Sequence, residues 1–170
     1  GCGGAGGAPA DRVSSPLDGA ACSLSQAGEA HVLANLIKRW FRQLPMRLFD
    51  VVPSERRVAC STGAECLALL QSDAFPPLQK GITLWLLELM SDVVDNGEEN
   101  KMSLDAIAIV LSPNLYTPLA EGADPYEALH HAKVMAHFVV ELLSAFTSTR
   151  NQWRSNSDGL AASEEAAEAA

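Results

Sequence analysis

Residues 78–97 read LQKGITLWLLELMSDVVDNG, and this stretch decides the fold class. Its large apolar residues recur every three or four positions, which is the repeat of an α-helix with one apolar face. Asn and Gly commonly end helices, so we expect this one to stop near Asn96 and Gly97. The longest apolar stripe of the chain predicts a central helix whose core-facing residues are Leu78, Ile82, Trp85, Leu86, Leu89, Met90, Val93 and Val94.

The same spacing predicts a helix at each end of the domain. Residues 29–44 form the first, which Pro45 ends, and the last opens at Asp124-Pro125. The predicted buried residues of the first helix are Leu33, Leu36, Ile37, Trp40, Phe41 and Leu44. Those of the last helix are Leu129, Met135, Phe138, Val139, Leu142, Leu143 and Phe146.

Local signals place three shorter helices between these elements. One should begin at Pro53, and a second after Thr62, where Glu65 completes the spacing of a capping box. Ser103 can cap a third helix over residues 104–111, which Pro113 breaks. Because no stretch alternates like a strand, the chain is predicted to be an all-α helical bundle.

Length and composition indicate one globular domain, residues 29–150, between two segments with few large apolar residues. The Gly- and Ala-rich lead 1–28 and the acidic tail 151–170 are predicted to be disordered. The first residue is Gly rather than Met, so we expect the chain to be cut from a longer polypeptide. The most apolar run, 82–90, is far shorter than the roughly 20 residues of a membrane span, which predicts a soluble domain, and the lack of a disulfide pattern predicts a cytoplasmic one.

The formal net charge of −9 argues against nucleic-acid binding, which needs a basic face. The charge is unevenly placed, because half of the 12 Lys and Arg residues fall between positions 38 and 57. We call this segment, with a local net charge of +4, the basic island. Its cations are Lys38, Arg39, Arg42, Arg47, Arg56 and Arg57, against Asp50 and Glu55.

Motifs for catalysis, cofactors and metals are missing from the sequence. It has no G-x-S-x-G, no Walker A loop and no C-x-x-C pair, so we expect no cofactor and no metal. The single E-x-x-H of Glu127 and His130 is one copy of a motif that di-iron bundles use twice. The four cysteines are predicted to be reduced thiols: Cys2, Cys22, Cys60 and Cys66.

Two stretches, HVLANLIKRWFRQLP at 31–45 and NKMSLDAIAIVLSPNL at 100–115, resemble the RhoGAP (Rho GTPase-activating protein) domain. The likeness is greatest to the plant type, which acts on Rho-of-plants (ROP) GTPases, and it covers about residues 29–146. The resemblance implies the RhoGAP helical fold and a GTP-loaded Rho-type GTPase as partner. It also implies that the following residues bind the GTPase: Lys38, Arg42, Asn100, Lys101, Pro113 and Asn114.

Two departures from the family pattern concern catalysis. The family inserts an arginine beside the γ-phosphate of the GTPase, an effect on the order of 10³–10⁵ in rate. The Gly-Ile-Phe-Arg loop that carries this arginine is absent, and Arg12 is the only arginine in that region, so we expect the N-terminal helices with this loop to be missing. In addition, Ala106 stands where the family has an Asn that helps to hold the switch region, and a methyl group makes no hydrogen bond.

Three hypotheses follow from the sequence. The first is a GTPase-binding regulator, not an enzyme itself, whose stimulation of hydrolysis is weak or absent and whose GTPase would bring it to the plasma membrane. The second is an active GTPase activator whose arginine lies in upstream sequence. The third is a non-catalytic helical scaffold that binds unrelated partners.

Overall fold

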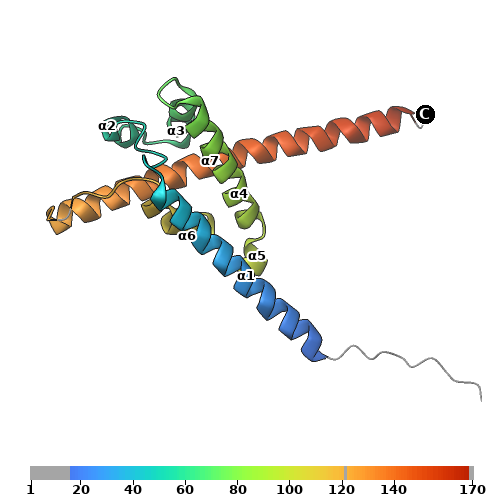
Figure 1. Ribbon diagram of the computed structural model, residues 1–170. Helices are drawn as coiled ribbons and strands as arrows, with labels where there is room; N and C mark the ends of the chain where they lie inside the picture. The colour runs from blue at the N-terminus through green and yellow to red at the C-terminus, as the bar shows by residue number, and fades with distance from the viewer. Residues whose placement is uncertain (1–15, 121, 169–170) are drawn as a thin grey trace, which may run out of the picture. The chain divides into compact units, whose positions relative to one another are not determined.

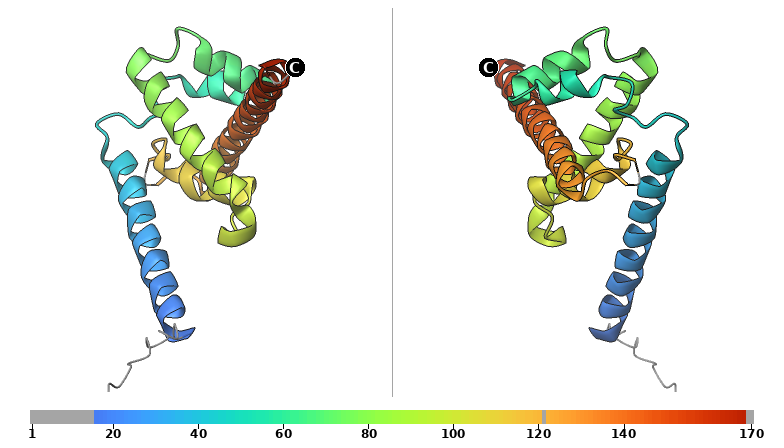
Figure 2. Two further views of the ribbon diagram at one scale, coloured as in Figure 1. Left: turned by 90° about the vertical axis from the view of Figure 1, so that its right-hand side faces the viewer. Right: turned by 90° about the vertical axis from the view of Figure 1, so that its left-hand side faces the viewer.

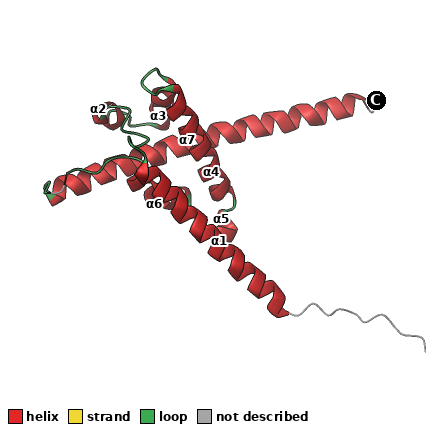
Figure 3. Ribbon diagram, in the orientation of Figure 1, coloured by secondary structure: helices red, strands yellow, loops and turns green. Residues whose placement is uncertain are grey.

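The computed structural model describes the backbone of residues 16–120 and 122–168 and the side chains of 28–120 and 122–155. Within these residues all regular structure is helical, as Figure 3 shows, so the predicted all-α class is confirmed for them. The chain divides into two units, residues 1–37 and 38–170. Helix α1, Pro16–Gln43, runs across the boundary, and every other helix belongs to the second unit.

The second unit is organised around α7, Pro125–Glu168, against which most of the other helices pack. Helices α2 and α3 lie at one end of α4, and α5 lies at its other end (Figures 1 and 2). The remaining elements are α2 (Ser54–Val58), α3 (Gly63–Gln71), α4 (Pro77–Asp95), α5 (Gly97–Asn100), α6 (Leu104–Leu111) and the 3₁₀ turn η1 (Ser112–Asn114).

The predicted helix starts are confirmed atom by atom. Thr62 and Glu65 form a capping box in which the Thr62 Oγ1 accepts from the Glu65 N–H at 3.4 Å and Glu65 Oε2 accepts from the Thr62 N–H at 3.1 Å. Ser103 caps α6 by accepting from the Ala106 N–H at 3.2 Å. These side chains satisfy amide groups that have no partner inside their own helices.

The core gathers around Phe49, which meets Phe75 and Phe138 edge to face at ring-centroid distances of 6.3 and 5.5 Å. Close packing of α3 on α7 depends on Gly63, since a Cβ there would lie 2.6 Å from the Cβ of Ala145. On α7 the predicted core is largely confirmed, with Met135, Phe138, Val139, Leu142 and Leu143 buried. Leu129 is exposed and Phe146 is half-buried, because the stripe extends past the helices that cover it.

The predicted apolar stripe of α4 is only partly buried. Leu86 and Met90 lie in the core, but Leu78 is 69% exposed and Trp85 is 53% exposed. The buried face instead includes Leu87, Thr83 and Ser91, and the Ser91 hydroxyl bonds the Thr147 hydroxyl of α7 at 2.8 Å. Since α4 is apolar around more than half of its circumference, spacing alone did not show which side would be covered.

Helix α1 also differs from its prediction. Of the residues expected to be buried, Phe41 is fully buried, whereas Leu33, Leu36 and Trp40 are exposed. The helix begins at Pro16 rather than at Glu29, and α7 continues to Glu168. Alanine explains this difference, because it favours helix without any need to bury a side chain.

Candidate functional site

The basic end of α1 presents two cations four residues apart, which places them on one side of the helix. Arg42 is exposed and Lys38 is partly exposed. Neither side chain makes a hydrogen bond or ion pair with any other residue that the structure describes, and the same holds for Arg39. The end of α1 therefore carries positive charge that the fold itself does not use.

Two further cations of the basic island, Arg47 and Arg57, have partners inside the fold. Arg47 donates from Nη1 to the backbone carbonyl of Asn114 at 3.3 Å. Arg57 is 5% exposed, and its only described ion-pair partner is Asp50, at 3.6 Å. Burial lowers the pKa of Arg57, with Asp50 opposing the effect. The continuous basic stretch of the sequence thus contains free cations on α1, two structural cations, Arg47 and Arg57, and the exposed Arg56 on α2.

Asn100 and Lys101 lie exposed where α5 ends, at the far end of α4 from α2 and α3 (Figure 1). Lys101 has a backbone φ of 59°, in the left-handed region. The side chain of Asn100 is hydrogen-bonded to backbone on both sides of this turn. Helix α5 itself had no expected counterpart in the sequence, because four residues are too few to show a periodic pattern.

Pro113 and Asn114 lie in η1, directly after α6. Pro113 is exposed, but Asn114 is 4% exposed and its side-chain amide donates to the carbonyls of Val110 and Leu111, both at 3.1 Å. Asn114 therefore closes the end of α6 from within the fold. Ala106, the position of the missing family Asn, is partly exposed on α6.

The candidate residues form three separate groups: Lys38 with Arg42, Asn100 with Lys101, and Pro113 with Asn114. No hydrogen bond or ion pair among the described residues joins one group to another. Arg12 lies outside the described residues, as do the side chains of Cys2 and Cys22.

Thiols and metal ligands add no further chemistry in the described part of the chain. Cys60 and Cys66 are free, and burial raises the pKa of Cys66 to about 12. No group of three His, Cys, Asp or Glu side chains with metal-site geometry occurs among these residues.

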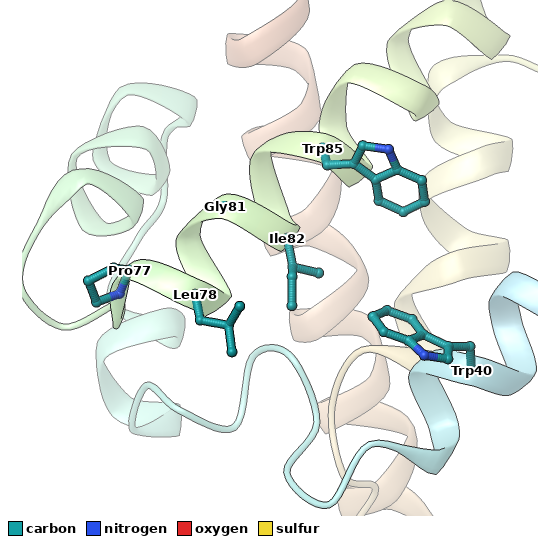
Figure 4. A pocket seen from close by; sticks show the side chains of 6 residues that line it. All are labelled: Trp40, Pro77, Leu78, Gly81, Ile82 and Trp85. Carbon is teal, nitrogen blue, oxygen red and sulfur yellow. The ribbon is translucent and has the colours of Figure 1, made fainter.

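An open apolar groove of about 420 Å³ lies beside α4, and the sequence did not predict it. Figure 4 shows the rings of Trp85 on α4 and Trp40 on α1 to the same side of Ile82, one above and one below it. Pro77, Leu78 and Gly81 complete the lining, so no charged side chain borders it. The groove exists because Trp40, Leu78 and Trp85, which were expected in the core, remain at the surface.

The two sequence motifs, at 31–45 and 100–115, and the all-α fold of the described residues agree with the class of regulatory domain that the sequence predicted. The chain belongs to the RhoGAP domain family, whose model matches residues 11–120. The match begins within the predicted lead and ends before α7, whereas the resemblance was placed at about 29–146. The predicted family is therefore confirmed, with different limits.

Relatives in plants and in a social amoeba support this assignment. "Rho GTPase-activating protein 3" of Arabidopsis thaliana is 37% identical over 115 residues, which are 68% of this chain and 24% of the relative. "Rho GTPase-activating protein 2" of Arabidopsis thaliana is 33% identical over 135 residues, 79% of this chain and 30% of the relative. "Rho GTPase-activating protein gacA" of Dictyostelium discoideum is 30% identical over 116 residues, 68% of this chain and 33% of the relative.

The chain spans about a quarter to a third of the length of these relatives. No solved structure matches it significantly. Among the described helices, none combines the length and the apolar character needed to cross a bilayer.

Proposed function

We propose that this domain binds a Rho-type small GTPase in its GTP-bound state and acts as a regulator rather than as an enzyme in its own right. The observation that carries the proposal is the basic end of α1, where Lys38 and Arg42 are accessible and make no ion pair with described residues. The matched relatives, which are named Rho GTPase-activating proteins, support a Rho-type partner.

Charge gives a physical reason for this docking face. The chain carries a formal net charge of −9, so most partner surfaces of negative charge would be repelled at long range. The free cations at the end of α1 attract negative charge locally, and they can orient an acidic partner on that surface. Since Lys38 and Arg42 already lie in water without internal partners, binding does not have to break an ion pair within the fold.

We also propose that the domain stimulates GTP hydrolysis weakly or not at all. The sequence contains no Gly-Ile-Phe-Arg, and Ala106 offers only a methyl group where the family has a hydrogen-bonding side chain. An arginine placed beside the γ-phosphate accounts for a factor on the order of 10³–10⁵ in such reactions. Binding without this cation would hold the GTPase in its GTP state instead of converting it.

Charge-removing variants test the docking face. Lys38→Ala and Arg42→Ala should each weaken binding to a ROP GTPase loaded with a non-hydrolysable GTP analogue by roughly tenfold, the size of one well-placed contact. Higher salt should reduce the difference between these variants and the wild type. Titration calorimetry with the GTP-analogue and GDP forms measures both the loss and the preference for the GTP state.

Arg56→Ala is the matched control, because Arg56 is an exposed cation of the same island on a different helix. It should change affinity by less than about twofold. A loss equal to that of Arg42→Ala would mean that general positive charge, and not the α1 face, attracts the GTPase. Absence of any binding by the wild type would favour the scaffold hypothesis.

Single-turnover hydrolysis tests the second part of the proposal. With saturating domain, the rate of GTP hydrolysis by the ROP protein should stay near its intrinsic value. Ala106→Asn should leave it there, because the stabilising cation is still missing. Stimulation within a few-fold of an intact RhoGAP domain would refute the claim of weak catalysis.

A further inference from the structure

The turn that joins α5 to α6 holds a lysine in a conformation that lysine rarely adopts. Lys101 has φ 59° and ψ 22°, and among the described residues it is the only one other than glycine with a positive φ. A side chain with a Cβ is strained in this left-handed region, and glycine usually occupies such a position after a helix. A lysine at this position therefore suggests a role for its side chain, which glycine lacks.

Asn100 fastens the backbone on both sides of this residue. Its Nδ2 donates to the carbonyl of Val93 on α4 at 2.6 Å, and its Oδ1 accepts from the N–H of Met102 at 2.7 Å. The single side chain therefore ties the end of α4 to the residue that precedes the cap of α6. One N–H and one lone pair of the amide are thereby engaged inside the fold, which fixes the orientation of the Asn100 side chain.

The turn is also sterically closed around Lys101. The Lys101 N–H donates to the carbonyl of Gly97 at 2.9 Å, and a Cβ on Gly97 would lie 3.0 Å from the carbonyl oxygen of Met102. The Lys101 Nζ donates to the backbone carbonyl of Glu98, so in the free domain the ammonium group rests on the turn itself. No carboxylate of the described residues holds it.

We infer that Asn100 is a positioning residue that keeps Lys101 in the left-handed turn, and that the Lys101 ammonium binds an acidic side chain of the GTPase. The inference rests on the proposed function. On binding, Nζ leaves the neutral carbonyl of Glu98 for a carboxylate, which makes a stronger, charge-assisted hydrogen bond. Asn100 itself does not touch the partner, although family resemblance alone grouped it with the binding residues.

Lys101→Gly separates the two roles, because glycine accepts the left-handed conformation and removes only the side chain. The midpoint of thermal unfolding should stay the same or rise, while affinity for the GTP-analogue form of a ROP GTPase falls roughly five- to tenfold. The association rate should also depend less steeply on salt, since one cation is gone. Affinity equal to that of the wild type would overturn the inference.

A double-mutant cycle shows whether Asn100 acts through Lys101. Asn100→Ala should weaken binding about as much as Lys101→Gly, and the double variant should bind no more weakly than Lys101→Gly alone. Because glycine adopts the left-handed conformation without strain, the double variant should stay folded, and its binding can be measured below its unfolding midpoint. Fully additive losses would mean that Asn100 contacts the partner itself, which would overturn its positioning role.

The α1 variants separate failure of this inference from failure of the proposed function. If Arg42→Ala weakens binding and Lys101→Gly does not, the turn is only structural and the docking face survives. If the wild type binds no Rho-type GTPase in either nucleotide state, the proposed function fails and the inference fails with it.

Discussion

The cations of the α4–α7 contact and those at the end of α1 are the same residue types in opposite situations. The side chain of Arg150 is 8% exposed and binds three carboxylates of α4, those of Glu88, Asp92 and Asp95. The Arg42 side chain is exposed and forms no ion pair with a described residue. Among the described residues, only Arg57, Arg150 and Arg154 form ion pairs, and the last two share the acids of α4.

Ion pairs distinguish the cations that stabilise the fold from those that are available to a partner. On α4 the three acids recur at intervals of four and three residues, so they line one side of the helix and face Arg150 and Arg154 of α7. Burial alone would lower the pKa of Arg150, but hydrogen bonds to Asp92 and Glu88 outweigh it and raise the pKa. Arg150 is therefore engaged in a helix contact, and its remaining donor, Nε, is buried and out of reach of a partner.

Arg150→Met should destabilise the domain more than any of the other substitutions. Removing the cation leaves three facing carboxylates without their shared partner, and we expect a loss of about 2–4 kcal/mol in the free energy of unfolding. The value lies toward the lower end for a buried pair, because the carboxylates remain partly exposed and can be rehydrated. Urea unfolding followed by circular dichroism measures the loss.

Arg42→Ala is the matched control in the other region. It should change the free energy of unfolding by less than about 0.5 kcal/mol, as expected for an exposed side chain without a partner. Arg154→Ala should fall between the two, since Arg154 shares the same acids but is about half exposed. Equal losses for Arg150→Met and Arg42→Ala would show that the distinction between structural and free cations is wrong.

The sequence predicted helices well where a local signal marks their ends. The capping box of Thr62 and Glu65 and the Ser103 cap each needed only a few neighbouring residues, and both formed as expected. The core face of α7 was also predictable, because one clear stripe is covered on one side. Residues close together in the sequence determine these features, so they can be predicted from the sequence.

Features that depend on distant segments could not be predicted in the same way. On α4, Trp85 and Leu86 are adjacent and both apolar, yet Leu86 is fully buried and Trp85 lines an open groove. Spacing shows that a helix has an apolar face, but the neighbours decide which part of that face is covered. The separation of the basic island into free and buried cations has the same origin, since Arg57 is buried by the packing of α2 on α7.

The candidate site shows a similar division. Family resemblance assigned Asn100 and Asn114 the same GTPase-binding role as Lys38 and Arg42. In the structure, hydrogen bonds engage both asparagine side chains within the chain. A motif records that a residue type is needed at a position without showing whether it contacts a partner or supports a turn. The backbone angle of Lys101 is likewise seen only in the structure, because the sequence has no signal for a left-handed lysine.

His131 should make the smallest contribution to stability, and that contribution should depend on pH. Its ring can gain a proton beside the buried cation of Arg57. His131 lies on α7 with its ring edge to face with Tyr116 at 5.2 Å. Burial lowers the pKa of His131, the nearby Arg57 and His130 lower it further, and Asp50 opposes them. Protonation therefore places a second positive charge near one that the fold already holds.

The sign of the pH effect follows from the lowered pKa. In the unfolded chain His131 should titrate near the ordinary value of about 6.5, so between that pH and the lower folded pKa the unfolded state binds more protons. The contribution to stability is then complete above about pH 6.5 and declines as the pH falls below it. His131→Phe keeps the aromatic contact with Tyr116 and should remove this part of the acid sensitivity.

Nuclear magnetic resonance titration of the His131 ring tests the cause directly. The midpoint should lie below about 6.5 in the wild type and should move upward in Arg57→Met, where the neighbouring charge is gone. Arg42→Ala should leave the midpoint unchanged, since Arg42 is not among the groups that act on His131. A wild-type midpoint at or above 6.5 would mean that Asp50 outweighs both burial and Arg57, and His131 would then stabilise the fold in its protonated form.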